Sequence, residues 1–311
     1  MKTLYLDCGM GAAGDMLMAA LWEILPDAQA KEQFIRDLNE AGIPKVTVTA
    51  KADMKCGIVG THMEVICDGQ EEHSHDESDH EHVHDHHHDH DHDHEHHHEH
   101  DHDHHHDHDH HHDHHHASMG EIDHIIEHLQ VSEKVKEDVR AIYRLVAQAE
   151  AQVHGKQVSE IHFHEVGMMD ALADITGCAM LMERLQPQEV IASPINVGFG
   201  KVRCAHGVLP VPAPATAAIL QGVPSYAGRI EGELCTPTGA AILKYYTTKF
   251  AQMPVMVTER NGYGTGKKDF PAANVVRTLW GESLTEQTPS VVAGKESVTG
   301  DADSYLKERR C

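Results

Sequence analysis

The spacing of apolar residues along the chain predicts a mixture of helices and strands. Helical spacing predicts helices over residues 132–155 and 169–185. It predicts others that begin after residue 14, after Ser118 and at Thr236, and two that end at Leu38 and before Gly222. Short or alternating apolar runs predict strands near residues 3–6, 45–50, 58–67, 161–167, 190–192, 196–202, 255–258 and 275–279, with a glycine loop over 261–266. Because these elements alternate irregularly, we expect an α+β fold with a mixed sheet.

One block interrupts this pattern. Residues 68–117 contain no Lys or Arg and almost no apolar side chain, and 26 of the 33 His lie between His73 and His116, among 15 Asp or Glu. Such a segment cannot bury enough surface to offset its ordering entropy, so we expect a long disordered His/Asp-rich insertion. The chain then divides into an N-terminal β-α part (1–67), the insertion (68–117), the remainder of the folded domain (118–282) and a polar tail (283–311).

The block is dense in metal ligands. Neutral imidazole binds nickel, copper, zinc and iron, with affinity rising from nickel to copper, so the ligand type does not choose the metal. A solubilising spacer or an affinity tag is the alternative, against which the interleaved acids and the internal position argue. The predicted tract ligands are His86, His87, His88, His96, His97, His98, His104, His105, His106, His110, His111, His112, His114, His115 and His116.

Charge and cysteine content exclude several classes of function. The formal net charge is −25, and removing the 15 carboxylates of the block still leaves −10, so a nucleic-acid partner is not expected. The seven Cys include no C-x-x-C pair, which argues against a disulfide framework or a thiolate zinc site. No apolar run approaches the ~18 residues of a membrane span. We therefore expect a cytoplasmic protein without a membrane partner.

Two further motifs carry candidate chemistry. His162 and His164 are two residues apart and share one face of an extended strand, with Glu165 beside them, while Asp170 and Asp174 share one face of the next helix. Two imidazoles with two or three acids suit a borderline divalent ion with open positions. A strand edge followed by helix-capping aspartates explains the same spacing about equally well.

A glycine turn follows the first strand. Gly9, Gly11 and Gly14 have G-x-G-x-x-G spacing, although Asp7 and Asp15 beside them would repel a dinucleotide. A metal-bridged phosphate held by these carboxylates and the turn amides fits better. Thr236 and Thr238, at a later helix start, offer hydroxyls to an anion, although ordinary N-capping explains them as well.

In this order the motifs resemble the LarC family of nickel insertion proteins, which complete the nickel-pincer cofactor of lactate racemase and related enzymes. The resemblance spans about residues 1–281. It rests on residues 6–16, the histidine tract, His162 to Gly167 with Asp170 and Asp174, His206-Gly207 with 210–216, and 233–241.

The resemblance implies a nickel chelatase of the lyase class, which inserts Ni²⁺ into pyridinium-3,5-bisthiocarboxylic acid mononucleotide. It implies CTP as a nucleotide, and a second divalent ion such as Mg²⁺ or Mn²⁺ could join it. His162, His164, Glu165, Asp170 and Asp174 become candidate metal ligands or proton acceptors, and Asp7 and Asp15 become candidate phosphate or metal partners.

The resemblance also implies partners and a departure. A lactate racemase-type enzyme would receive the cofactor. Family members commonly continue into a further C-terminal domain, whereas this chain ends in a polar tail. A companion product could supply that domain, and nickel insertion could require it. A nickel storage protein without turnover is the main alternative, and a metal-dependent phosphohydrolase is a third.

Overall fold

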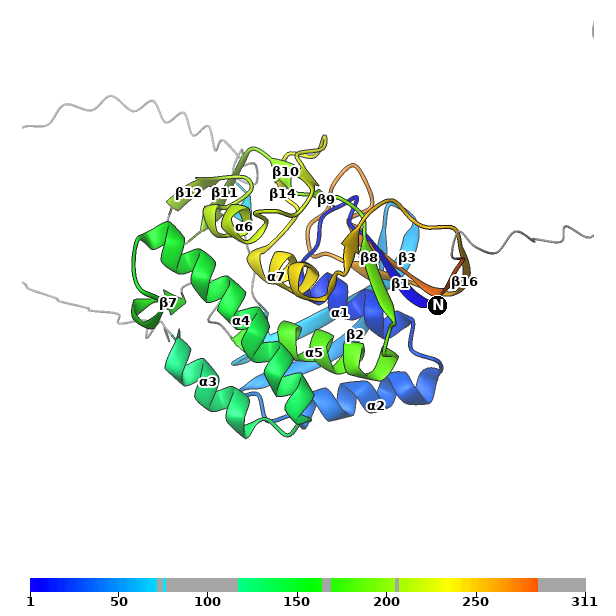
Figure 1. The fold of residues 1–311 in the computed structure, drawn as a ribbon, viewed down its shortest axis with the longest axis horizontal. Coiled ribbons are helices and arrows are strands. Elements are labelled where there is room, and N and C mark those ends of the chain that lie inside the picture. Colours follow the sequence, from blue (N-terminus) through cyan, green and yellow to red (C-terminus); the bar gives the residue numbers. More distant parts are fainter. Residues whose placement is uncertain (72–74, 77–116, 164–168, 205–206, 285–311) are drawn as a thin grey trace, which may run out of the picture.

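A mixed sheet organises the molecule. The computed structural model describes residues 1–71, 75–76, 117–163, 169–204 and 207–284 (Figure 1). The helices are α1 (Gly14–Glu23), α2 (Ala28–Asn39), α3 (Met119–His128), α4 (Glu133–His154), α5 (Met169–Leu185), α6 (Pro214–Ile219) and α7 (Pro237–Tyr246), with a short 3₁₀ helix η2 (Val158–Glu160). The longer strands are β1 (Lys2–Asp7), β2 (Val46–Lys55), β3 (Ile58–Cys67), β8 (Glu189–Ala192), β11 (Lys201–Cys204), β12 (Gly207–Pro210), β16 (Met256–Thr265) and β17 (Val275–Ser283).

Two-residue strands complete the architecture. They are β4 (Gln70–Glu71), β5 (His75–Asp76), β6 (Ala117–Ser118), β7 (His162–Phe163), β9 (Ile195–Asn196), β10 (Gly198–Phe199), β13 (Ser225–Tyr226), β14 (Gly232–Glu233) and β15 (Lys249–Phe250). The central sheet has the order β15-β8-β1-β17-β16-β3-β2, with β4 added beside β3. Parallel pairs (β1 with β8, β3 with β16) and antiparallel pairs (β1 with β17, β2 with β3) both occur, so the predicted α+β class is confirmed.

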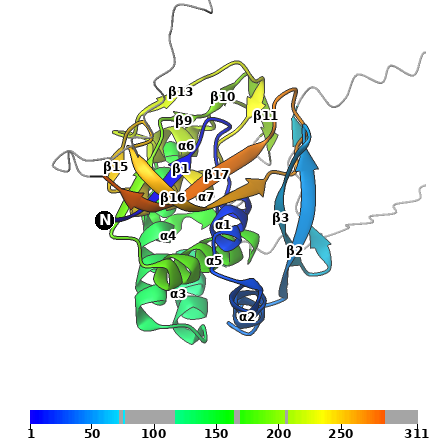
Figure 2. The ribbon, with the colours of Figure 1, turned by 90° about the vertical axis from the view of Figure 1, so that its right-hand side faces the viewer.

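Helices α1 and α5 form an inner layer on one side of this sheet (Figure 2). Helix α1 contacts β16 and β3, and α5 lies between α1 and α4. Both inner helices bury residues on all sides, among them Leu17 and Met18 of α1 and Leu172 and Ile175 of α5. A helix that is apolar on every face is stable only inside a core, and this placement fixes the ends of α1 and α5 within the domain.

Two of the predicted helices begin and end at the predicted residues. Helix α4 is capped by the side chain of Ser132, which accepts a hydrogen bond from the amide of Val135, and it ends at Gly155 in the left-handed conformation. Helix α5 has the predicted bounds. None of the helices in the described ranges is long and apolar enough to cross a membrane.

The predicted glycine loop over residues 261–266 is wrong. Residues 261–265 belong to β16, which continues from Met256 to Thr265, and only Gly266 lies beyond the strand. Gly262 and Gly264 face α1: a Cβ on Gly262 would lie 2.4 Å from the carbonyl oxygen of Ala20, and one on Gly264 would lie 1.9 Å from that of Met16. The glycines let the strand approach the helix backbone closely. In the sequence alone, the same closely spaced glycines predict a turn.

The histidine insertion is attached at both flanks. Near its start, β4 pairs with β3 and β5 pairs with β11, and at its end β6 pairs with β7, so these few residues of the predicted disordered segment form short strands. The predicted disorder of the insertion concerns residues that lie mostly outside the described ranges.

Candidate functional site

The N-terminal ends of α1 and α5 meet inside the domain. Gly14, the first residue of α1, lies so close to Asp174 that a Cβ at position 14 would be 2.5 Å from Oδ2 of Asp174. One turn further along α5, Sγ of Cys178 donates a hydrogen bond to the carbonyl of Gly14 over 3.7 Å. Because Gly14 has no side chain, the start of α1 can lie directly beside Asp174 of α5.

Three carboxylates gather at this junction. Asp15 and Asp170, each in the first turn of its helix, are half-buried, while Asp174 is only 4 % exposed. Burial raises the pKa of Asp174 well above its usual range, and the charges of Asp170 and Asp15 add to this effect. In the described part of the chain, Oδ1 of Asp174 has no hydrogen-bond partner. A buried carboxylate with an unpaired oxygen costs stability, and such groups concentrate at functional sites.

Two more side chains act on this carboxylate cluster (Asp15, Asp170 and Asp174). Tyr143 of α4 is fully buried, and burial together with the charges of Asp174 and Asp170 raises its pKa well above the usual value. The positive charge of Lys267, just after β16, lowers the pKa of Asp174 against these effects. Neither residue belongs to a sequence motif, because Tyr143 lies on the apolar face of a helix and Lys267 follows a segment whose glycines predict a loop.

The imidazole ligands predicted from the sequence are only partly placed. The backbone of His162 lies in β7, opposite Ser118 of β6. His164, Glu165 and the tract histidines from His86 to His116 lie outside the described residues. Within the described ranges, no group of three or more His, Cys, Asp or Glu side chains could hold a metal ion. The carboxylate cluster is therefore not a complete metal site by itself.

The glycine turn packs closely against protein. Gly11 has φ +81° and would place a Cβ 1.9 Å from the carbonyl oxygen of Leu234. Gly239 of α7 would likewise place one 2.2 Å from the carbonyl oxygen of Ala12. After α1 the chain enters α2 and then the antiparallel pair β2 and β3, which is not the order of a dinucleotide-binding unit. Close packing therefore accounts for Gly11 and Gly14 without a dinucleotide.

Asp7 and Asp15 have different neighbours. Oδ2 of Asp7 accepts a hydrogen bond from the guanidinium of Arg277 over 2.6 Å, and Oδ1 accepts one from the amide of Gly9 over 3.2 Å. Asp15 instead lies beside Asp174, and its carboxylate accepts a hydrogen bond from the amide of Met16. A phosphate or metal site shared by Asp7 and Asp15 stays a prediction. Arg277, at an ordinary strand position, was missed.

Thr236 caps α7. Its hydroxyl accepts a hydrogen bond from the amide of Gly239 over 3.2 Å and lies 3.0 Å from the hydroxyl of Thr238. This geometry is that of an ordinary N-cap. An anion-binding role for the two threonines stays a prediction.

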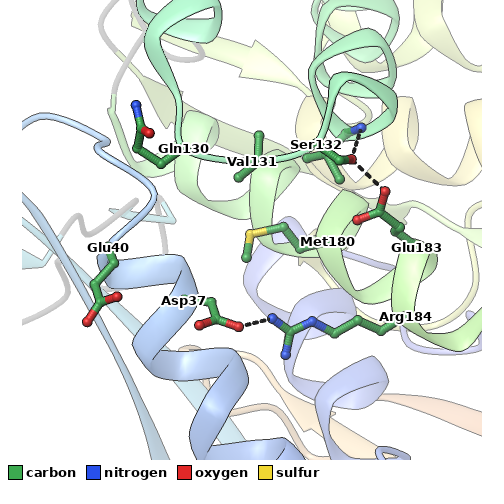
Figure 3. A pocket seen from close by; sticks show the side chains of 9 residues that line it. Asp37, Glu40, Gln130, Val131, Ser132, Met180, Glu183 and Arg184 are labelled. Atoms are coloured by element: carbon green, nitrogen blue, oxygen red, sulfur yellow. Dashed lines mark hydrogen bonds and ion pairs between the residues drawn. The ribbon is translucent and has the colours of Figure 1, made fainter.

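A pocket of about 470 Å³ lies elsewhere, between α2, the start of α4 and the end of α5 (Figure 3). Arg184 pairs with Asp37 over 2.5 Å, and the hydroxyl of Ser132 donates to Glu183 over 2.5 Å. The pocket contains none of the residues predicted to carry chemistry, and its charged groups largely satisfy one another. The candidate site is therefore the carboxylate cluster and not this pocket.

Comparison with known proteins identifies relatives along almost the whole chain. The family described as nickel insertion protein matches residues 4–301. The chain is 38 % identical to the pyridinium-3,5-bisthiocarboxylic acid mononucleotide nickel insertion protein of Clostridium acetobutylicum, over 92 % of this chain and 66 % of the relative. It is 37 % identical to the protein of the same name from Desulfitobacterium hafniense, over 92 % of this chain and 60 % of the relative.

A third relative of that name, from Geobacillus kaustophilus, is 36 % identical over 95 % of this chain and 64 % of its own length. The chain thus spans about three-fifths of the length of the curated relatives it matches. No solved structure matches it. With a family match over most of its length and relatives of this identity, the chain belongs to the nickel insertion protein family.

Proposed function

We propose that this protein takes part in inserting Ni²⁺ into pyridinium-3,5-bisthiocarboxylic acid mononucleotide, the nickel-pincer cofactor precursor. The observation that carries the proposal is the family match over residues 4–301, together with relatives named for this reaction. In this reaction nickel, the cargo, leaves protein ligands for the two thiocarboxylates and a ring carbon of the substrate. The ring carbon loses a proton, so a proton acceptor must lie near the ring.

The carboxylate cluster supports a site for this exchange. Asp15 and Asp170 are half-buried and stand at the starts of two helices, whereas Asp174 is too buried to touch a substrate. We assign Asp15 and Asp170 to contact with the metal or the proton, and Asp174 to their positioning. His162, His164 and Glu165 belong to the proposal as further ligands, because they precede α5 in the sequence.

The histidine tract gathers nickel in this proposal. Strand β6, where the tract ends, pairs with β7, and β7 precedes α5 along the chain. Nickel bound on the tract is therefore tethered to the domain that contains the cluster, which raises its effective concentration there. A chain lacking 77–116, with β5 and β6 retained, should need more free nickel for the same activity and should reach it at saturating nickel.

Several additional components complete the proposal. CTP would act as the nucleotide, and a lactate racemase-type enzyme would receive the product. Carboxylate oxygens suit a hard ion such as Mg²⁺ or Mn²⁺, so Asp15 and Asp170 would contribute to holding a second divalent ion if other ligands completed the set. The part of the relatives that this chain does not match could supply a further domain.

The test is direct. The purified chain is incubated with nickel and the mononucleotide, with and without CTP, and the nickel-containing product is measured by mass spectrometry. Product in excess of protein would establish a catalytic insertase. Bound nickel without product would favour the storage alternative, unless a longer chain restores activity. Phosphate release from nucleotides without the pyridinium substrate would favour the phosphohydrolase. The Asp170→Asn variant should lose product, whereas Asp37→Asn, in the pocket of Figure 3, should retain it.

A further inference from the structure

The loop between β16 and β17, residues 266–274, is held in one conformation by contacts at both ends. The amide of Gly266 donates to the carbonyl of Asn274 over 3.0 Å, and Nδ2 of Asn274 donates to the carbonyl of Lys268 over 2.9 Å. Asn274 is 6 % exposed, so these contacts are shielded from water. They fix the backbone on one side of Lys267.

Lys55 holds the same loop from the other side. This last residue of β2 is 9 % exposed, and its Nζ donates to the carbonyl of Lys267 over 3.2 Å and to Oδ1 of Asp269 over 2.7 Å (Figure 2 shows the β2–β3 pair beside the loop). Burying an ammonium group is costly unless its donors are paired. Here the buried charge holds a loop backbone. Two neighbouring carbonyls, of Lys267 and Lys268, are thus held by two buried side chains.

This loop begins against the start of α1. A Cβ on Gly266 would lie 2.9 Å from Sδ of Met16, the residue after Asp15. Lys267 is half-buried at this point, and its charge acts on Asp174, as described above. The contacts of the loop therefore present Lys267 at the carboxylate cluster.

The chemistry of the substrate needs a cation there. A mononucleotide with two thiocarboxylates is strongly anionic, and the half-buried carboxylates of Asp15 and Asp170 repel it. The thiocarboxylates are occupied by nickel in the proposed reaction, which leaves the phosphate without a partner. A lysine ammonium is a compact charge that binds phosphate well.

We propose that Lys267 binds the phosphate of the mononucleotide and that Lys55 is the positioning residue that holds Lys267 in place. This inference rests on the proposed function. It adds a substrate-binding residue and its support, neither of which lies in a motif of the sequence.

The test measures binding of two probes by calorimetry at low salt without nickel: the mononucleotide, and the nucleoside obtained by removing its phosphate. The wild-type protein should prefer the mononucleotide, and Lys267→Met should weaken its binding by about 10- to 100-fold with little effect on the nucleoside. Lys267→Arg should retain part of the preference. Lys51→Met, on the same strand as Lys55 but with a 58 % exposed side chain, is the charge-matched control and should bind like wild type.

Lys55→Met should reduce the preference for the mononucleotide while leaving the nucleoside affinity intact. If that variant fails to fold, Asp269→Asn removes the charge of one acceptor of Lys55 at an 87 % exposed side chain and should reduce the preference less. A wild-type protein that binds both probes equally, or a Lys267→Met variant that keeps the preference, overturns the assignment and leaves the proposed function standing. A wild-type protein that binds neither probe overturns the assignment of Lys267, and the product assay with nickel and CTP then decides separately whether the proposed function stands.

Discussion

Replacing Gly14 with Ala tests the contact that builds the candidate site. The added Cβ would lie 2.5 Å from Oδ2 and 2.6 Å from Cβ of Asp174, whereas ordinary contact begins near 3.4 Å. Helix α1 or α5 must therefore move by about 1 Å, and both helices are buried on most sides. Such overpacking costs ~1–3 kcal/mol.

Part of this cost is offset, because alanine is favoured over glycine in a helix by about 0.5–1 kcal/mol. The net loss should be ~0.5–2 kcal/mol, which lowers the melting temperature by about 1–8 °C in a domain of this size. Thermal unfolding followed by circular dichroism, and urea unfolding at 25 °C, measure it.

The control is Gly9→Ala in the same turn. Its Cβ would meet only the end of the Asp7 side chain at 3.2 Å, so its stability should change by less than ~0.5 kcal/mol. Asp174→Gly in the Gly14→Ala background should recover part of the loss, giving a double variant more stable than the sum of its single changes. A Gly14→Ala protein as stable as wild type would show that the helices are not in contact there.

Three further predictions concern stability and metal binding. Asp138→Ala should lower the free energy of unfolding by ~2–4 kcal/mol in urea, because buried Asp138 accepts hydrogen bonds from the hydroxyls of Tyr245 and Tyr246 over 2.7 and 3.0 Å; a loss below about 1 kcal/mol would contradict this. Burial and the hydrogen bond to Asp138 raise the pKa of Tyr245 from 10.0 to about 12, so its contribution to stability is full below pH 10 and is lost as pH rises through 12. Tyr245→Phe should flatten that alkaline decline in urea titrations, and an unchanged slope would count against it. Nickel bound per chain, measured by equilibrium dialysis, should fall steeply between pH 7.5 and 5 as the tract imidazoles protonate near pH ~6.5, and it should be low at both pH values without 77–116.

Local signals in the sequence were sufficient for elements whose ends are set by their own residues. Helix α4 begins at Ser132 and ends at Gly155 because a hydroxyl cap and a left-handed glycine act within one turn of the chain. The interpretation of residues 261–266 failed for the opposite reason. Gly262 and Gly264 must lack a side chain because the backbone of α1, far away in the sequence, lies against them. The spacing of residues along β16 does not reveal that contact.

The candidate site shows the same division. Asp170 and Asp174 were predicted to share a helix face, and they do share the start of α5. Their meeting with Asp15 depends on tertiary contact through Gly14, and the approach of Lys267 depends on a loop that Lys55 and Asn274 hold. These are long-range pairings that no local pattern encodes. The roles of His162, His164 and Glu165 stay predictions.

The pairing of β1 with β17 has a consequence for biosynthesis. Lys2 lies opposite Glu282 and Asp7 opposite Arg277, so β1 has a partner strand that is synthesised after every other strand of the described central sheet. Until then β1 and β16 lack the strand that joins them, and unpaired strand edges invite aggregation. Polypeptides interrupted before residue 275 should therefore be cleared by proteases or held by chaperones, which makes the sheet a checkpoint on complete synthesis of this domain.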